Sequence, residues 1–231
     1  MLRGKCASCG SRVSFQYPLV ELGTGALFLF SYLLAAPFAS GVYFFPLMAL
    51  LFFWSSFIVL LAYDIRHTLV PMAFVAPLAA SALALRVGEA FLFSSMEPLY
   101  DALWGALVIG GLFLAVVFIT RGKGMGLGDV YVAGALGILF GFARGLEVIT
   151  LAFWIGATAG IALVVLSRVR NLYSRSLLSS PHHARKVGQS KKGFTMKSEV
   201  PFVPFLFMAT LVGVFTNFSP LAFVGALIAS L

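Results

Sequence analysis

Charged residues are scarce in this sequence. Only 10% of its 231 residues are Asp, Glu, Lys or Arg, whereas 61% are apolar, and the mean hydropathy is +1.01. A soluble domain of this length needs far more polar surface to cover its core, so these values exclude that class. Because a helix crosses the hydrocarbon with about 20 apolar residues, the chain is long enough for roughly seven crossings. We therefore expect an all-α fold, a polytopic membrane helical bundle.

Cysteine is also scarce, and the two cysteines present lie only three positions apart. Cys6 and Cys9 are too close for an ordinary structural disulfide, whereas this spacing suits a metal. A structural zinc site normally takes four ligands, so the pair supplies half of one. His182 and His183, or a second chain, could complete the site. A simple unmetallated pair is the alternative.

The apolar residues gather into seven segments of membrane-spanning character. We expect spans at Leu19–Ala36, Tyr43–Tyr63, Leu69–Val87, Ala102–Thr120, Asp129–Phe142, Leu146–Leu166 and Pro201–Phe215. A further apolar tail, Pro220–Leu231, is too short to cross unaided. The expected organisation is an N-terminal cytoplasmic segment (1–17), a transmembrane bundle (18–167), a basic cytoplasmic loop (168–199), and a C-terminal helix with its tail (200–231).

Basic residues orient these spans, because Lys and Arg remain preferentially in cytoplasmic loops. With the N-terminus in the cytoplasm, 14 of the 16 basic residues fall on the cytoplasmic side, and only Arg86 and Arg144 fall outside. The net charge of +8 then faces the anionic lipid of the inner membrane, so the lipid bilayer is the expected partner of this charge. Nucleic-acid binding is not expected.

The chain contains only three aspartates, and two of them are candidates for chemistry. Asp101 opens an expected helix on the outer side and is interpreted as a helix cap. Asp64 ends the second span and Asp129 begins the fifth. With a rise of 1.5 Å per residue, they lie about 31 Å and about 24 Å from the outer surface, a similar depth near the cytoplasmic boundary. Ionisable groups at such a depth are costly, which makes both candidates for a functional site.

Two close carboxylates do not both ionise easily, and a pair that shares a proton is the arrangement of an aspartic protease. One carboxylate takes a proton from water while its protonated partner polarises the scissile carbonyl. The alternative is that Asp64 and Asp129 merely pair with Arg66, Arg121 or Lys123 at the membrane edge.

Three glycines stand within the five residues before Asp129. Gly124, Gly126 and Gly128 would let a substrate strand approach the carboxylate closely, so we interpret them as an active-site loop. A phosphate-binding loop is the competing interpretation, but it would need a lysine and a hydroxyl residue after the glycines. Val130 and Tyr131 follow instead.

Several motifs in this order resemble the type IV prepilin peptidases, which belong to the GxGD class of aspartyl proteases. They are Gly126-Leu127-Gly128-Asp129, Tyr63-Asp64-Ile65 with Leu69-Val70-Pro71, Tyr17-Pro18-Leu19-Val20-Glu21-Leu22, Pro201-Phe202 with Pro204-Phe205, and Arg3-Gly4-Lys5-Cys6 with Cys9. The resemblance implies catalytic roles for Asp64 and Asp129, and no cofactor for the peptidase reaction. It also implies cleavage of the leader of type IV prepilins or type II secretion pseudopilins at the cytoplasmic face of the inner membrane.

The sequence departs from this family in ways that bear on its function. An earlier membrane helix and an earlier Cys-x-x-Cys, usual in bacterial members, have no counterpart before Met1, so N-methylation of the mature end is not expected. Tyr131 stands where a lysine is usual. Two alternatives remain: an ion-coupled transporter, which would carry its carboxylates near the midplane, and an inactive relative of the peptidases.

Overall fold

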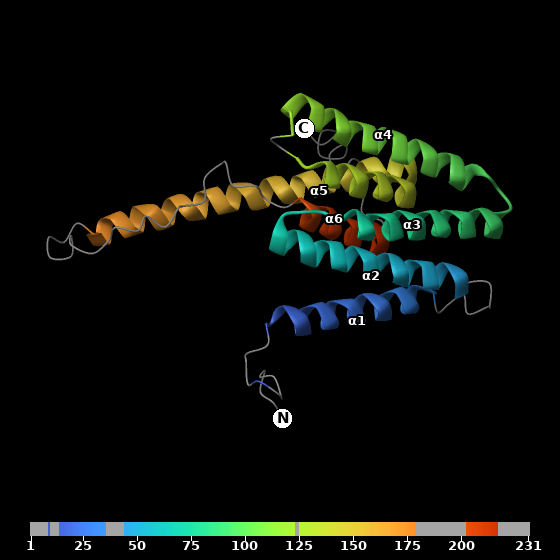
Figure 1. The fold of residues 1–231 in the computed structure, drawn as a ribbon, viewed down its shortest axis with the longest axis horizontal. Coiled ribbons are helices and arrows are strands. Elements are labelled where there is room, and N and C mark those ends of the chain that lie inside the picture. The colour runs from blue at the N-terminus through green and yellow to red at the C-terminus, as the bar shows by residue number, and fades with distance from the viewer. Residues whose placement is uncertain (1–8, 10–13, 36–43, 123–124, 179–201, 217–231) are drawn as a thin grey trace, which may run out of the picture. The chain divides into compact units, whose positions relative to one another are not determined.

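The computed structural model describes residue 9 and residues 14–35, 44–122, 125–178 and 202–216. These residues form six helices (Figure 1), which are α1 (Gln16–Ala35), α2 (Phe44–His67), α3 (Met72–Phe93), α4 (Glu97–Thr120), α5 (Leu127–Leu178) and α6 (Val203–Phe215). The chain divides into two compact units, Met1–Leu146 and Glu147–Leu231. The all-α expectation is confirmed for the described part of the chain.

Four stretches of the described residues are long and apolar enough to cross a membrane. They are Phe44–His67, Met72–Phe93, Glu97–Thr120 and Leu127–Val169, judged by length and composition. A helix bonds its backbone N–H and C=O groups to one another along the segment, as hydrocarbon requires. The chain is therefore a polytopic membrane protein. Helix α1 occupies the first predicted span and α6 is a shorter apolar helix.

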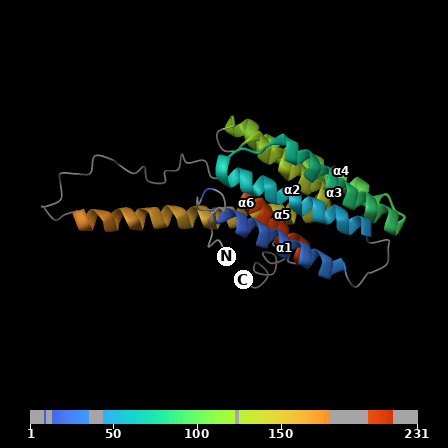
Figure 2. The same cartoon turned by 60° about the horizontal axis from the view of Figure 1, so that its bottom comes forward.

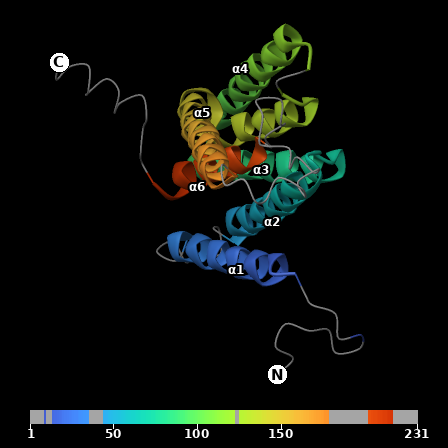
Figure 3. The same cartoon turned by 90° about the vertical axis from the view of Figure 1, so that its left-hand side faces the viewer.

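In the first unit, α1 to α4 follow one another in space as they do in sequence (Figures 1, 2 and 3). Helix α2 is the centre of this arrangement, with α1 and α3 packed against it. Its buried side chains include Phe53, Trp54 and Phe57, whose rings meet edge to face at centroid distances of 5.5 and 5.7 Å. Such geometry suits the quadrupoles of aromatic rings.

A left-handed residue directly follows each of α2, α3 and α4, where the chain leaves the helix. Thr68, Ser94 and Arg121 have φ near +50° and follow α2, α3 and α4. After α3, the amide of Ser95 donates to the carbonyl of Ala90, and after α4 the amide of Gly122 donates to that of Val117. These bonds satisfy carbonyls that the last helical turn would otherwise leave without partners.

Helices α4 and the beginning of α5 cross at glycines. A Cβ on Gly105 would overlap the Gly137 carbonyl, and a Cβ on Gly137 would overlap the Gly105 carbonyl. Small residues at such crossings let membrane helices approach closely enough for extensive van der Waals contact. This crossing therefore fixes α4 against residues 127–140.

Helix α5 covers the ranges predicted as two separate spans, with one interruption inside it. Gly141 has φ 73° and ψ −168°, a backbone conformation that is essentially restricted to glycine. The helix resumes at Phe142, and a Cβ on Gly145 would be 3.9 Å from the Cα of Gly137, a distance that one continuous helix does not allow for residues eight positions apart. The chain therefore turns back at Gly141, so the two predicted spans are separate helical segments and the turn between them lies just before the predicted position at residues 143–145. The helix also continues to Leu178, into the range predicted as a basic loop.

The second unit contains the rest of α5 and helix α6. Phe202 lies 5.2 Å from the Phe153 ring and 6.0 Å from the Phe205 ring, measured between centroids. Gly156 faces Phe205, where a Cβ would be 3.3 Å from the ring. Aromatic packing against a small residue therefore holds α6 to this stretch of α5. The apolar tail predicted at 220–231 lies outside the described residues.

Candidate active site

Two of the three aspartates lie together at one end of the first unit. Asp64 is in the last turn of α2 and is 3% exposed, and Asp129 is in the first turn of α5 and is 9% exposed. Their carboxylates are close enough to interact electrostatically. Two acids that are separated by 65 positions of sequence therefore share one buried environment.

The beginning of α5 orients Asp129. The Asp129 amide donates to the Gly126 carbonyl at 3.2 Å, and a backbone hydrogen bond from Gly126 acts on the Asp129 carboxylate. Asp129 is the third residue of the helix, so its carboxylate reaches back to the Gly126 amide as the acid of a capping box does, whereas Gly126 has no side chain for the other half of that motif. Among the described residues, the charged group that acts on Asp129 is Asp64, and no cation does so.

Gly128 brings the beginning of α5 against the connection between α2 and α3. A Cβ on Gly128 would overlap the side chain of Val70. Val70 follows Asp64 closely in sequence, so this contact ties the segment after one carboxylate to the segment before the other. Sequence reasoning identified Gly128 as a close-approach residue but did not identify Val70 as its partner.

The remaining predicted site residues are placed only in part. Gly126 precedes α5, and a Cβ there would be 4.0 Å from Asp129 Oδ2, an ordinary van der Waals contact, whereas Gly124 lies outside the described residues. Cys9 is exposed, and Cys6, His182 and His183 lie outside the described residues. In the described ranges no group of three or more His, Cys, Asp or Glu could hold a metal. The zinc half-site remains a prediction.

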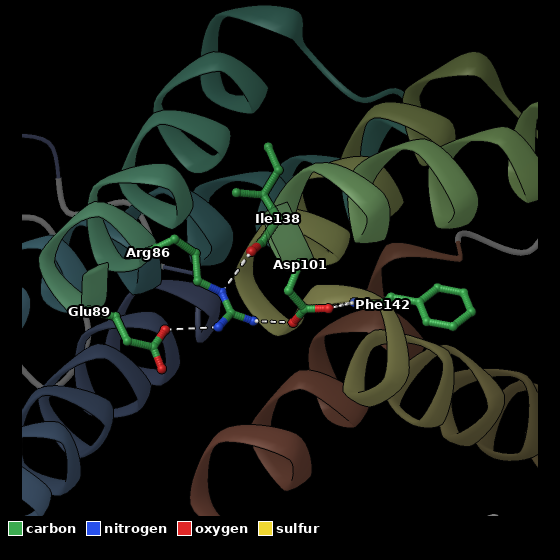
Figure 4. Close-up of polar contacts among 5 residues, drawn as sticks. All are labelled: Arg86, Glu89, Asp101, Ile138 and Phe142. Atoms are coloured by element: carbon green, nitrogen blue, oxygen red, sulfur yellow. Dashed lines mark hydrogen bonds and ion pairs between the residues drawn. The ribbon is translucent and has the colours of Figure 1, made fainter. Parts of the chain in front are cut away.

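Asp101 has a different role from the one predicted. Helix α4 begins at Glu97 rather than near Ala102, so Asp101 lies inside the helix and does not cap its start. Its carboxylate instead pairs with Arg86 and accepts a hydrogen bond from the amide of Phe142 (Figure 4). The signal for this role was Arg86, one of only two basic residues on the predicted outer side.

Family models match two parts of the chain. The type IV leader peptidase family matches residues 50–161, which include both buried aspartates. The bacterial Peptidase A24 N-terminal domain matches residues 1–35. No solved structure matches this one.

Curated relatives named prepilin leader peptidase/N-methyltransferase are similar over most of the chain. The protein of Bacillus subtilis is 34% identical over 174 residues, covering 72% of this chain and 62% of the relative. That of Aeromonas hydrophila is 34% identical over 165 residues (71% and 54%), and that of Stutzerimonas stutzeri 33% over 182 residues (74% and 56%). The chain thus spans about 54–62% of the length of these relatives. By these matches, of which the family model spans both acids of the buried pair, the chain belongs to the type IV leader peptidase family.

Proposed function

We propose that this chain is a membrane aspartyl endopeptidase that removes the leader of type IV prepilins or type II secretion pseudopilins. The observation that carries this proposal is the pair of buried carboxylates, Asp64 and Asp129, within the region matched by the family model. A buried ionisable pair is costly in a membrane protein, which favours a functional explanation.

In this mechanism the two carboxylates share one proton. The ionised carboxylate accepts a proton from water, whose oxygen attacks the scissile carbonyl carbon, while the protonated carboxyl donates its proton to the carbonyl oxygen. The tetrahedral intermediate then collapses, the C–N bond breaks, and the leaving nitrogen takes up a proton. Water is the only co-reactant, so the peptidase reaction needs no metal or other cofactor.

The glycine-rich segment is proposed as the active-site loop. Gly128 permits the close approach to Val70, and the absence of a side chain at Gly126 keeps that position, 4.0 Å from Asp129 Oδ2, free of a Cβ. An extended substrate backbone needs such space to bring its carbonyl to the acids. Gly124 is assigned to the same loop from the sequence alone.

We further propose a topology of about seven crossings in the inner membrane, with the N-terminus in the cytoplasm. The four long spans, α1, α6 and the break in α5 are compatible with that number. The distribution of Lys and Arg supports the orientation. Both carboxylates then lie near the cytoplasmic boundary, where the basic leader of a membrane-inserted precursor would be presented.

A transporter is a weaker interpretation of the same residues. Transport sites are typically near the midplane, on interrupted helices. Helix α5 is interrupted, but at Gly141, roughly 18 Å along the helix from Asp129 by a rise of 1.5 Å per residue. The acids and the break are therefore separate features of this chain.

Cleavage of a purified type IV prepilin tests the proposal. Membranes that contain the protein are incubated with the precursor, and a shift in gel mobility together with the mass of the product identifies the cleaved bond. Membranes with an Asp64→Asn/Asp129→Asn variant are the control. Cleavage by the wild-type protein alone is expected. An uncut precursor with active positive-control enzyme would indicate the inactive relative instead.

A further inference from the structure

Three helices of the first unit meet at the break in α5, and two charged residues hold them there (Figure 4). Arg86 comes from α3, and Asp101 comes from α4. The Arg86 Nη2 and Asp101 Oδ2 atoms are 3.7 Å apart, and the Arg86 side chain is only 12% exposed. We call Arg86 and Asp101 the clamp.

The clamp satisfies the two halves of one helical hydrogen bond. In an uninterrupted helix the amide of Phe142 would donate to the carbonyl of Ile138, four residues earlier. Here the Phe142 amide donates to Asp101 Oδ1 at 2.9 Å, and Arg86 Nε donates to the Ile138 carbonyl at 3.1 Å. Asp101 thus accepts a hydrogen bond from the free amide, and Arg86 donates one to the free carbonyl. Both backbone groups that the break leaves without a helical partner are thereby satisfied.

Gly141 is also required for the contact between the clamp and α5. Its φ of 73° requires glycine, and a Cβ at this position would also overlap the Asp101 carboxylate. The break and the acid that occupies it therefore require one another. Asp101 could not reach the Phe142 amide past a larger residue.

The clamped helix segment is the one that carries Asp129. Residues 127–140 begin against Val70, through Gly128, and end at the clamp. A hydrogen-bonded helix transmits displacement along its axis, so the clamp sets the depth and rotation of the whole segment. Phe142 is about 20 Å along the helix from Asp129, so the clamp does not touch the bond that would be cleaved.

We propose that Arg86 and Asp101 are positioning residues for the peptidase reaction, acting on Asp129 through residues 127–140. This inference rests on the proposed function of the aspartate pair. Displacement of a catalytic group by about 1 Å can reduce a rate by about a hundredfold, so a distant clamp can control turnover. Substrate affinity does not depend on the clamp.

Steady-state cleavage of purified type IV prepilin in detergent micelles tests this inference. Asp101→Ala removes both the acceptor for Phe142 and the partner of Arg86, and we expect kcat to fall at least about tenfold while KM stays within about twofold. Asp101→Asn keeps an oxygen that accepts from the Phe142 amide, so it should restore most of kcat.

Glu89→Gln is the matched control. Glu89 Oε2 accepts from Arg86 Nη1 at 2.8 Å, a contact between two residues of α3. Its loss should leave kcat within about twofold of the wild-type value. A wild-type kcat in Asp101→Ala, an equal loss in Asp101→Asn, or an equal loss in Glu89→Gln would each overturn the inference.

A spin-label distance gives a readout that is independent of catalysis. Labels are attached at His67→Cys and Tyr131→Cys, both exposed positions, in a chain with Cys6→Ser and Cys9→Ser. Asp101→Ala should broaden or shift the distance between the labels, whereas Glu89→Gln should not. If Asp101→Ala is not recovered folded, Arg86→Lys replaces it, because a single ammonium cannot hold the three partners of the guanidinium in this geometry. An unchanged distance and kcat in Arg86→Lys would contradict the inference.

Asp129→Asn separates this inference from the proposed function. If Asp129→Asn still cleaves prepilin, the function assigned to the aspartate pair is wrong. The distance between the spin labels is then the measurement that tests whether the clamp positions residues 127–140. If Asp129→Asn is inactive but Asp101→Ala retains the wild-type kcat, only the positioning inference fails.

Discussion

At the scale of single residues, the proposed chemistry depends on proton exchange by two carboxyl groups. Asp64→Asn and Asp129→Asn each keep the shape of the side chain but cannot exchange a proton in the same way. We expect each substitution to lower kcat for prepilin cleavage by at least about a hundredfold. Product formation is followed by gel mobility, with protein amount and folding checked by size-exclusion chromatography in detergent.

The control for this prediction is another acid that lies in an exposed position. Glu97→Gln removes an exposed carboxylate from the first turn of α4, a helix that carries neither acid of the buried pair. It should retain the wild-type rate. Substantial cleavage by either aspartate variant would remove that residue from the catalytic assignment.

The contact between Gly128 and Val70 leads to a second prediction at this scale. Gly128→Ala forces a methyl group into the Val70 side chain and should displace the beginning of α5, lowering kcat about tenfold or more. Val70→Gly removes the obstructing atoms, so the double variant should recover part of the lost rate. Recovery is measured as kcat of the double variant relative to each single variant.

Gly134→Ala serves as the comparison for Gly128→Ala because it is on the same helix and a Cβ there has no neighbour within 4 Å. It should leave cleavage unchanged. If Gly128→Ala is equally harmless, the approach of α5 to Val70 is not needed for activity.

At the scale of elements, the crossing of α4 with residues 127–140 depends on the absence of side chains. Gly105→Ala places a methyl group against the Gly137 backbone and should lower the free energy of unfolding by about 1–3 kcal/mol. Unfolding is followed by circular dichroism during titration with sodium dodecyl sulfate. Gly111→Ala, on the same helix with open space at its Cβ, should change it little.

The elements also differ in how far the sequence could predict them. Helix α1 (Gln16–Ala35) matches the predicted span Leu19–Ala36 to within three residues, because a long apolar run predicts such a helix directly. Helix α4 begins at Glu97, before its predicted start, because a polar first turn carries no apolar signal. The turn between the fifth and sixth predicted spans lies at Gly141 rather than at residues 143–145, because the helix resumes at Phe142 and only Gly141 departs from helical φ and ψ.

The candidate active site, like the helices, could be predicted from the sequence only in part. Asp64 and Asp129 could be proposed as a pair because both fall at the same end of a predicted span. The partners of Asp101 could not, because they come from other helices and Phe142 is 41 positions away in sequence. Val70 was likewise hidden, since an aliphatic residue near a helix start has no distinctive signal. Contacts that depend on tertiary packing are absent from local patterns.

At the scale of the whole molecule, the proposed orientation places the aspartate pair on the cytoplasmic side and the clamp outside. Helix α2 carries Asp64 in its last turn, and the turn from α3 to α4 lies at the opposite end of α3 from the connection after α2. A label at His67 should therefore report the cytoplasm, and a label at Glu97 should report the outer side. Both side chains are exposed.

Cysteine labelling in intact cells tests this orientation. Glu97→Cys and His67→Cys are introduced one at a time into a chain with Cys6→Ser and Cys9→Ser, and cells with a permeabilised outer envelope are treated with a membrane-impermeant maleimide. Glu97→Cys should react at once, because the excess of Lys and Arg holds the other end of the helices in the cytoplasm. His67→Cys should react only after the inner membrane is opened. The reverse pattern would put the aspartate pair outside, where the cytoplasmic leader of a precursor could not reach it, and would remove the topology on which leader cleavage depends.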